Sequence, residues 1–248
     1  DRSREPVEVS VLIRSADSSL WANTRLGMEQ AAGDLGAELR FLTPGADNDQ
    51  EEQKELLRRE VERGTDALVL APVDPADLGA EWETLTRGTP TVTLESELPE
   101  AVALITPDNE ALGWALARRA LEEYRGGTVL LLDCLPENTG VQARVEAAEA
   151  ALIRGGATVL RWSETGEEEL IRLDEEGALA QVVALEIGAT EAAARAKERA
   201  GSSAALYGVG VTSRIAAWLE RGTISAVAAW SEYAAGYLAV QQAAGAAR

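Results

Sequence analysis

The chain has 248 residues, with 23 Lys+Arg against 42 Asp+Glu and a formal net charge of −19. It contains no histidine, which excludes Ser-His-Asp and Cys-His catalysis and a zinc site with histidine ligands. Its one cysteine, Cys134, excludes an internal disulfide and a cysteine-cluster metal site. The acidic balance argues against a nucleic-acid surface, which needs clustered cations. We therefore expect a globular protein without a metal or cofactor.

The sequence shows no membrane span and no signal peptide. Its apolar runs are far shorter than the roughly 20 residues that cross a bilayer. The first five residues, DRSRE, are polar and lack the apolar stretch of a signal peptide. Composition leaves two alternatives open: a cytoplasmic protein, or a mature chain from which a targeting segment was removed.

Strand and helix patterns alternate along the N-terminal part. Residues 7–13 carry β-branched side chains at alternate positions, which is typical of a strand. The run 67–71 is continuously apolar, as expected for a strand buried on both faces. Glycines at 36 and 64 are placed to end helices. The expected elements, in chain order, are strand 7–13, helix 20–35, strand 37–43, a helix from about 50 to 63, strand 67–71, helix 75–87, strand 91–94 and strand 101–105.

The alternation continues to the end of the chain, as in βαβ units with a parallel sheet. The expected elements are helix 110–124, strand 128–134, helix 139–154, strand 158–162, helix 167–175, strand 181–185, helix 190–200, strand 204–209, helix 212–221, strand 224–229 and helix 232–246. The number of units is close to that of a TIM barrel. However, strands 91–94 and 101–105 have no helix between them, which favours a crossing between two domains.

Several motifs resemble one family, the type I periplasmic solute-binding proteins of ABC importers, ribose-binding-like and sharing the LacI-type effector-core fold. The polar segment 17–21 opens the first helix and ends in Trp21. The segment RGTDALVLAPVD at 63–74 is similar to the family's strand followed by P-x-D. ITPDN at 105–109 with Gly113 is similar to the element that opens the family's second lobe.

The resemblance implies an α/β fold of two Rossmann-like lobes with parallel sheets joined by crossing strands, which close on a ligand like a hinge. The N-terminal lobe would comprise residues 1–107 and 231–248, and the C-terminal lobe residues 108–230. Family members usually carry a further strand after the last helix, and the sequence ends at Arg248 before such a strand.

Ligands of open α/β sheets bind beyond the carboxyl ends of the strands, so the loops at those ends are the candidate site. Indole rings there can pack against sugar C–H groups or cations. In the resembled family, Arg144 matches an arginine that binds ligand hydroxyls and Glu95 an acidic ligand-binding position, whereas Glu186 replaces an asparagine. The tryptophans can also be packing residues and the glutamates solvated charges. The predicted ligand-binding residues are Arg14, Asp17, Ser18, Trp21, Glu95, Arg144, Trp162, Glu186, Gly210 and Trp230.

Two departures from the family weaken the assignment of a ribose-type sugar. Ser96 stands where the family has an arginine, and Gly210 where it has an aspartate. A site with Glu95 and Glu186 among tryptophans could instead favour a cationic or amine-bearing solute. It could also take a larger sugar in the space freed at Gly210.

The leading hypothesis is an extracytoplasmic, monomeric binding protein, not an enzyme, that delivers a small polar ligand to an ABC permease. The resemblance implies that this ligand is a sugar. A second hypothesis is a ligand sensor that signals to a membrane partner. A third is an enzyme that uses Glu95 and Glu186 as general acid and base. Fold alone does not decide among them.

Overall fold

The computed structural model describes residues 5–163 and 166–248, which fold as two compact units. The N-terminal unit comprises residues 5–107, Glu137–Thr139 and Ser231–Arg248. The C-terminal unit comprises Asp108–Pro136 and Gly140–Trp230, apart from residues 164–165, which lie outside the described residues. The polar opening segment DRSRE falls largely on residues 1–4, which are also outside the described part.

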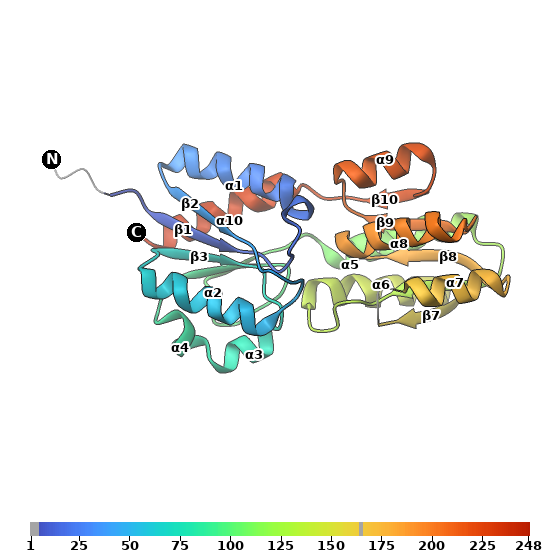
Figure 1. Cartoon of the computed structure of the whole chain (residues 1–248), viewed down its shortest axis with the longest axis horizontal. Helices are drawn as coiled ribbons and strands as arrows, with labels where there is room; N and C mark the ends of the chain where they lie inside the picture. The colour runs from blue at the N-terminus through green and yellow to red at the C-terminus, as the bar shows by residue number, and fades with distance from the viewer. Residues whose placement is uncertain (1–4, 164–165) are drawn as a thin grey trace. The chain divides into compact units, whose positions relative to one another are not determined.

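The N-terminal unit is built on a parallel five-stranded sheet with the order β2-β1-β3-β4-β5 (Figure 1). This order, in which the chain reverses direction across the sheet, is that of a doubly wound fold. Its strands are β1 (Glu8–Leu12), β2 (Glu38–Leu42), β3 (Ala67–Leu70), β4 (Thr91–Leu94) and β5 (Ala103–Ile105). Its helices are η1 (Ser18–Trp21), α1 (Ala22–Leu35), α2 (Gln50–Arg63), α3 (Pro75–Ala80), α4 (Trp82–Thr86) and α10 (Glu232–Ala246).

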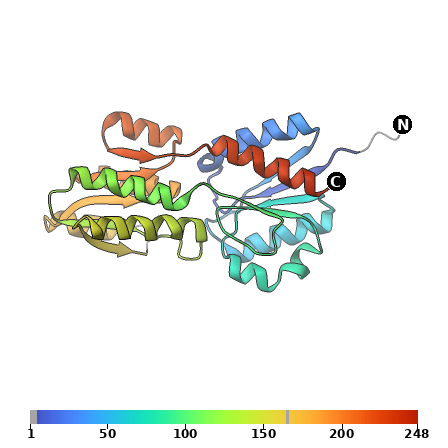
Figure 2. The same cartoon turned by 180° about the vertical axis from the view of Figure 1, so that it is seen from behind.

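Both faces of this sheet are buried by helices, which is why its central strand β3 is apolar throughout. One core joins β-strand residues to α1 and α10, and a second joins the opposite face to α2, α3 and α4. Figure 2 shows α10 alongside α1. The two helices touch through backbone: a Cβ built on Gly27 would lie 1.9 Å from the Tyr233 carbonyl oxygen. Only glycine permits this approach.

The C-terminal unit repeats the architecture with the strand order β10-β9-β8-β6-β7, also entirely parallel. Helices α5 and α6 bury one face, and α7, α8 and α9 bury the other. The strands are β6 (Thr128–Leu132), β7 (Thr158–Trp162), β8 (Leu179–Ala184), β9 (Ala205–Val209) and β10 (Ala226–Ala228). The helices are α5 (Asn109–Glu123), α6 (Thr139–Arg154), α7 (Glu167–Glu175), α8 (Ile187–Ala200) and α9 (Ser213–Arg221).

Two parallel sheets confirm the expected α/β class with two Rossmann-like halves, and the barrel alternative is wrong. The expected helix 75–87 is also wrong in detail, because it is two helices interrupted at Glu81. The ammonium of Lys54, which is largely buried, contacts the carboxylates of Asp77 at 2.6 Å and Glu81 at 2.5 Å. These ion pairs hold α3 and the residue between α3 and α4 against α2.

Helix α8 begins three residues before the expected position 190. The Glu186 carboxylate accepts a hydrogen bond from the Ala189 N–H at 2.8 Å and so caps the helix. Within the described part of the chain, no helix is both long and apolar enough to cross a membrane.

Candidate functional site

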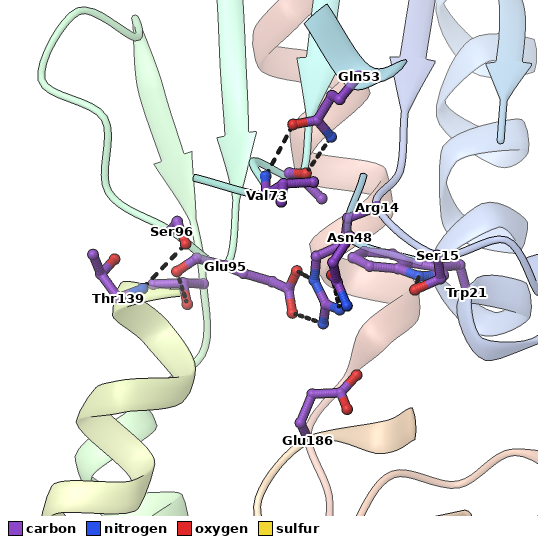
Figure 3. Close-up of polar contacts among 12 residues, drawn as sticks. Arg14, Ser15, Trp21, Asn48, Gln53, Val73, Glu95, Ser96, Thr139 and Glu186 are labelled. Atoms are coloured by element: carbon purple, nitrogen blue, oxygen red, sulfur yellow. Dashed lines mark hydrogen bonds and ion pairs between the residues drawn. The ribbon is translucent and has the colours of Figure 1, made fainter. Parts of the chain in front are cut away.

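Arg14 and Glu95 form an ion pair at the carboxyl edge of the N-terminal sheet (Figure 3). Arg14 follows β1 and Glu95 follows β4, so the fold brings together residues that are 81 positions apart. The guanidinium donates from Nε to Glu95 Oε1 at 2.7 Å and from Nη2 to Oε2 at 2.8 Å. This two-pronged geometry matches the fork of an arginine to the two oxygens of a carboxylate. The Arg14 side chain is 5% exposed and that of Glu95 15%.

Two neighbouring loops hold the ion pair in place. Arg14 also donates from Nη1 to Asn48 Oδ1 at 3.3 Å, and the Asn48 N–H donates back to the Arg14 carbonyl at 2.8 Å. Glu95 has a φ of +64°, and the Ser96 N–H donates to the Leu94 carbonyl at 2.7 Å across it. A glutamate at the centre of such a three-residue turn is a strained conformation. From this turn, the Glu95 carboxylate meets the Arg14 guanidinium.

Trp21 completes this edge of the N-terminal unit. The Arg14 guanidinium carbon lies 5.7 Å from the centroid of the indole, within the range of a cation–π contact. The indole Nε1–H donates to Ser15 Oγ at 3.0 Å, and the ring is 9% exposed. Trp21 is therefore both a core residue and a neighbour of the ion pair.

Asp17 and Ser18 have different surroundings from Trp21. The Asp17 carboxylate accepts hydrogen bonds from the Ser19 N–H at 3.0 Å and the Ser19 hydroxyl at 2.6 Å, which caps η1. Ser18 is exposed at the start of η1. The structure gives Asp17 a capping role, and Trp21 contacts Arg14.

Ser96 stands where the resembled family has an arginine, and it is fully buried. The Thr139 N–H donates to Ser96 Oγ at 3.1 Å, and the Glu97 N–H donates to Thr139 Oγ1 at 2.7 Å (Figure 3). Ser96 therefore anchors the segment Glu137–Thr139 to the β4–β5 loop. The guanidinium partner of Glu95 is Arg14, from the loop after β1.

Arg144 and Trp230 are the central pair at the carboxyl edge of the C-terminal sheet. Arg144 lies on α6, is 1% exposed, and places its guanidinium carbon 4.5 Å from the centroid of the Trp230 ring. It donates from Nε to Asn109 Oδ1 at 2.7 Å and from Nη1 to the Leu185 carbonyl at 3.0 Å. These contacts come from α5, the end of β8 and the end of β10, so three elements fix one guanidinium.

Glu186 directly follows the Leu185 carbonyl that Arg144 binds. Its carboxylate caps α8, where the helix N-terminus carries a partial positive charge. Burial raises the pKa of the nearby Cys134 thiol to about 12, and the carboxylates of Glu186 and Asp133 add to the shift. Cys134, which is half-buried, is thus a weakly reactive thiol.

Gly210 does not free space for a larger ligand, so that expectation is wrong. Its φ is +102°, a backbone conformation that residues other than glycine rarely adopt. A Cβ at this position would lie 2.9 Å from Ile187 Cγ1 and 3.2 Å from Ile215 Cδ1. The glycine is required by the backbone and by two isoleucines that already fill the space.

Trp162 ends β7 and packs, half-buried, against the core formed with α7, α8 and α9. Its carbonyl accepts from the Asp133 N–H at 2.7 Å. The Asp133 carboxylate in turn accepts from Arg161 Nε at 2.8 Å and Gln142 Nε2 at 2.5 Å. This network braces the loop after β6, and Trp162 contributes packing to it.

Three polar residues of these edges were not among the predicted site residues. Asn48 lies in the loop between β2 and α2 and has a φ of +52°, a conformation that asparagine tolerates in loops. Asn109 was quoted only as part of a motif, and its side chain orients Arg144. Ser15 was passed over, and its hydroxyl fixes the Trp21 ring. Ser15 is next to the predicted Arg14 in the sequence, whereas Asn48 and Asn109 reach Arg14 and Arg144 only through the fold.

The described residues contain no group of three or more Cys, Asp and Glu side chains arranged to hold a metal ion. What the two edges offer is hydrogen-bonding groups held rigidly beside indole rings. Hydrogen-bonding groups and indole rings are the chemical groups that recognise hydroxyl and C–H faces of polar solutes in other proteins.

Comparison with known proteins identifies the family. No curated protein matches the sequence. Among solved structures, a glucose-galactose binding protein from Geobacillus stearothermophilus is similar over 98% of this chain and 92% of its own, with 19% identity and a TM-score of 0.86. The periplasmic component of an ABC-type sugar transport system from Hahella chejuensis is similar over 97% and 94%, with 23% identity and a TM-score of 0.85.

A third similar structure is a carbohydrate transporter solute-binding protein from Agrobacterium radiobacter in complex with D-arabinose. It is similar over 99% of this chain and 90% of its own, with 17% identity and a TM-score of 0.86. These likenesses show the fold. The periplasmic binding protein domain matches residues 9–248, which is nearly the whole chain. The chain therefore belongs to the periplasmic binding protein family.

Proposed function

We propose that this protein captures a sugar and delivers it to an ABC importer. The observation that carries the proposal is the pair of rigid edges, Arg14–Glu95 beside Trp21 and Arg144 on Trp230. The similar structures whose names mention a ligand or transport system name sugars, which supports the same solute class.

The chemistry of both edges suits a polyhydroxylated ligand. Each Glu95 oxygen accepts one hydrogen bond from Arg14 and keeps capacity to accept a second from a hydroxyl. An arginine offers five N–H donors in a fixed fork, which suits recognition of hydroxyl oxygens. The indole faces of Trp21 and Trp230 can pack against the apolar C–H face of a sugar ring.

The further features of the proposal follow from the family. We place the protein outside the cytoplasm, acting as a monomer, with a permease as its membrane partner. It performs no reaction on its ligand. In support, the two carboxylates once considered as acid and base are each engaged within their own unit, Glu95 by Arg14 and Glu186 as the cap of α8.

Titration with neutral sugars tests the proposal. A broad panel of pentoses, hexoses and polyols is added while tryptophan fluorescence and heat are recorded. We expect at least one member to bind with a Kd well below about 1 mM, equivalent to more than about 4 kcal/mol of binding free energy. If no member of the panel binds more tightly than that, the proposal is wrong.

A matched pair of variants links binding to the site. Trp230→Leu removes the indole ring that the Arg144 guanidinium stacks on. The Kd for the sugar should rise about 10-fold or more, as is typical when an aromatic residue at the centre of a binding site is truncated. Trp114→Leu removes a similar stack, with Arg154 5.6 Å from the ring centroid, but on an exposed face of α5. Sugar affinity should be unchanged in Trp114→Leu, and equal losses in both variants would contradict the assignment.

A further inference from the structure

Helix α5 exposes a tryptophan at the middle of its outer face. Trp114 is 39% exposed, which makes it the most exposed of the six tryptophans. The helix lies beside α6 on one face of the C-terminal sheet (Figure 2). From α6, the guanidinium carbon of Arg154 lies 5.6 Å from the centroid of the indole. Tryptophan and arginine are enriched among the residues that dominate protein interfaces, so this face has the composition of a binding surface.

A hollow of about 430 Å³ lies beside the indole on the same helix. Two of its residues, Ala111 and Ala115, are exposed and have short side chains, which leaves room above the helix backbone. The hollow is large enough to take an aromatic side chain from a partner. The full lining is Asp108, Glu110, Ala111, Trp114, Ala115 and Arg118.

Two opposite charges flank Trp114 at equal distances along the helix. Glu110 and Arg118 are each four residues from the tryptophan, so they lie on its side of α5, about 6 Å before and after it. About 12 Å of helix separates them, too far for an ion pair with each other. On α1, by contrast, Arg25 pairs with Glu29 at 2.9 Å. Among the residues that the structure describes, the side chains of Glu110 and Arg118 have neither an ion-pair nor a hydrogen-bond partner.

A second copy of the same helix matches this pattern. If two α5 helices run antiparallel across a two-fold axis at Trp114, Glu110 of each copy faces Arg118 of the other. Each indole then meets the hollow above Ala111 and Ala115 of the other copy. Such a contact is isologous, because the same patch serves both partners and every pairing occurs twice. The charges and the hollow are thus satisfied together by the chain's own surface.

We propose that the outer face of α5 is a self-association surface on which two copies of this chain pair antiparallel and reversibly. A contact confined to about 12 Å of helix buries less than the roughly 1,200 Å² of a stable interface, so we expect a weak dimer with a Kd of about 100 µM. The net charge of −19 opposes association at long range. Salt at about 0.15 M screens that repulsion beyond about 8 Å.

The inference goes beyond the proposed function and does not depend on it. Each copy binds its own sugar, so a single chain remains the unit that captures the ligand. Trp114 and Arg118 lie outside the two edges assigned to the sugar. Variants of the α5 face should therefore keep the sugar Kd of the wild type, and a failure of pairing leaves the sugar-binding proposal intact.

A charge swap between copies tests the two-fold arrangement. Sedimentation velocity up to about 1 mM protein gives the dimer Kd of the wild type, Glu110→Arg and Arg118→Glu. Each single variant places like charges opposite each other twice, so its Kd should rise at least about 10-fold. An equal mixture of the two variants restores opposite charges at both places. The mixture should therefore form a heterodimer with about the wild-type Kd, although neither variant pairs with itself.

Two comparisons separate this contact from general repulsion. Arg58→Glu on α2 makes the same change of charge as Arg118→Glu, at an arginine that is 45% exposed, and should leave the dimer Kd close to that of the wild type. Glu110→Arg makes the chain less negative, so general repulsion predicts tighter pairing, whereas the two-fold contact predicts weaker pairing. Trp114→Leu changes no charge and should raise the dimer Kd at least about 10-fold.

Three results would overturn the inference. The first is a wild type that stays monomeric up to about 1 mM. The second is a set of charge variants, folded by circular dichroism, that pair as tightly as the wild type. The third is an equal mixture of Glu110→Arg and Arg118→Glu that remains monomeric while both variants are folded. If one charge variant fails to fold, Trp114→Leu and the other variant still test the contact, because each should lose pairing.

Discussion

Substituting Gly113 by alanine should damage both the stability of the C-terminal unit and ligand binding. Gly113 lies on α5 where that helix crosses α6. A Cβ built there would lie 2.3 Å from the carbonyl oxygen of Arg144 and 3.1 Å from the Cβ of Ala147. The first contact is to backbone, so no side-chain rotation relieves it. The two helices must move apart, and the residue that moves is the one that stacks on Trp230.

The expected magnitude follows from these distances. Ordinary contact begins at 3.4 Å, so α5 and α6 must separate by about 1 Å near Arg144. Overpacking of this kind costs about 1–3 kcal/mol. The better helix propensity of alanine offsets up to about 1 kcal/mol. We expect a net loss of about 1–2 kcal/mol in the free energy of unfolding, and a sugar Kd raised about 10-fold through the displaced guanidinium.

Urea unfolding followed by circular dichroism and sugar titration by calorimetry measure the two effects. Gly33→Ala on α1 is the control, because nothing lies within 4 Å of its Cβ position, and it should stabilise the protein by about 0.5–1 kcal/mol. Gly236→Ala has a backbone clash of 1.9 Å in the N-terminal unit, so it should lose stability and keep Arg144 in place. If Gly113→Ala binds sugar with wild-type affinity, the link between this contact and Arg144 is refuted.

Three further predictions concern other parts of the chain. Gln53, which is 1% exposed, donates to the Ala71 carbonyl and accepts from the Val73 N–H in the loop after β3, each at 2.9 Å. Gln53→Leu should lower the free energy of unfolding by about 2–4 kcal/mol, measured by urea unfolding. An unchanged urea midpoint would contradict this. The thiol of Cys134, with its pKa raised to about 12, should react with iodoacetamide at pH 8 at least about 100-fold more slowly than free cysteine, and a rate like that of free cysteine would argue against its burial. The pKa of Glu123 is lowered from 4.5 by the Tyr207 hydroxyl and by Arg119. The stability that this carboxylate contributes is therefore present above its unfolded pKa and is lost as pH falls through its lowered folded pKa. The difference in unfolding free energy between wild type and Glu123→Gln should shrink as pH falls below 4.5, and a constant difference would refute the assignment.

Much of the fold was predictable because its local signals agree with its tertiary structure. The helix at 139–154, the strand at 91–94 and the last helix at 232–246 have the expected bounds. In each of these elements, the apolar pattern and the residues at the two ends indicate the same boundaries. The interruption at Glu81 was not predictable, because it depends on Lys54, a cation from another helix.

The candidate site was predictable as a set of loops but not as a set of contacts. The rule that ligands bind at the carboxyl ends of strands identifies Arg14 and Glu95 separately. Their pairing depends on how β1, β3 and β4 lie side by side, which no local pattern reveals. Gly210 was misread for a related reason. A glycine after a strand can mean either open space or a special backbone, and only its φ of +102° distinguishes them.

A crystal structure with the sugar that binds most tightly tests the central claim most directly. The account predicts sugar hydroxyls within hydrogen-bond distance of Glu95 or Arg144, and an indole of Trp21 or Trp230 against a C–H face of the ring. It also predicts that the Arg14–Glu95 ion pair stays intact in the complex. A sugar bound elsewhere, or one whose hydroxyls contact neither Glu95 nor Arg144, would contradict it.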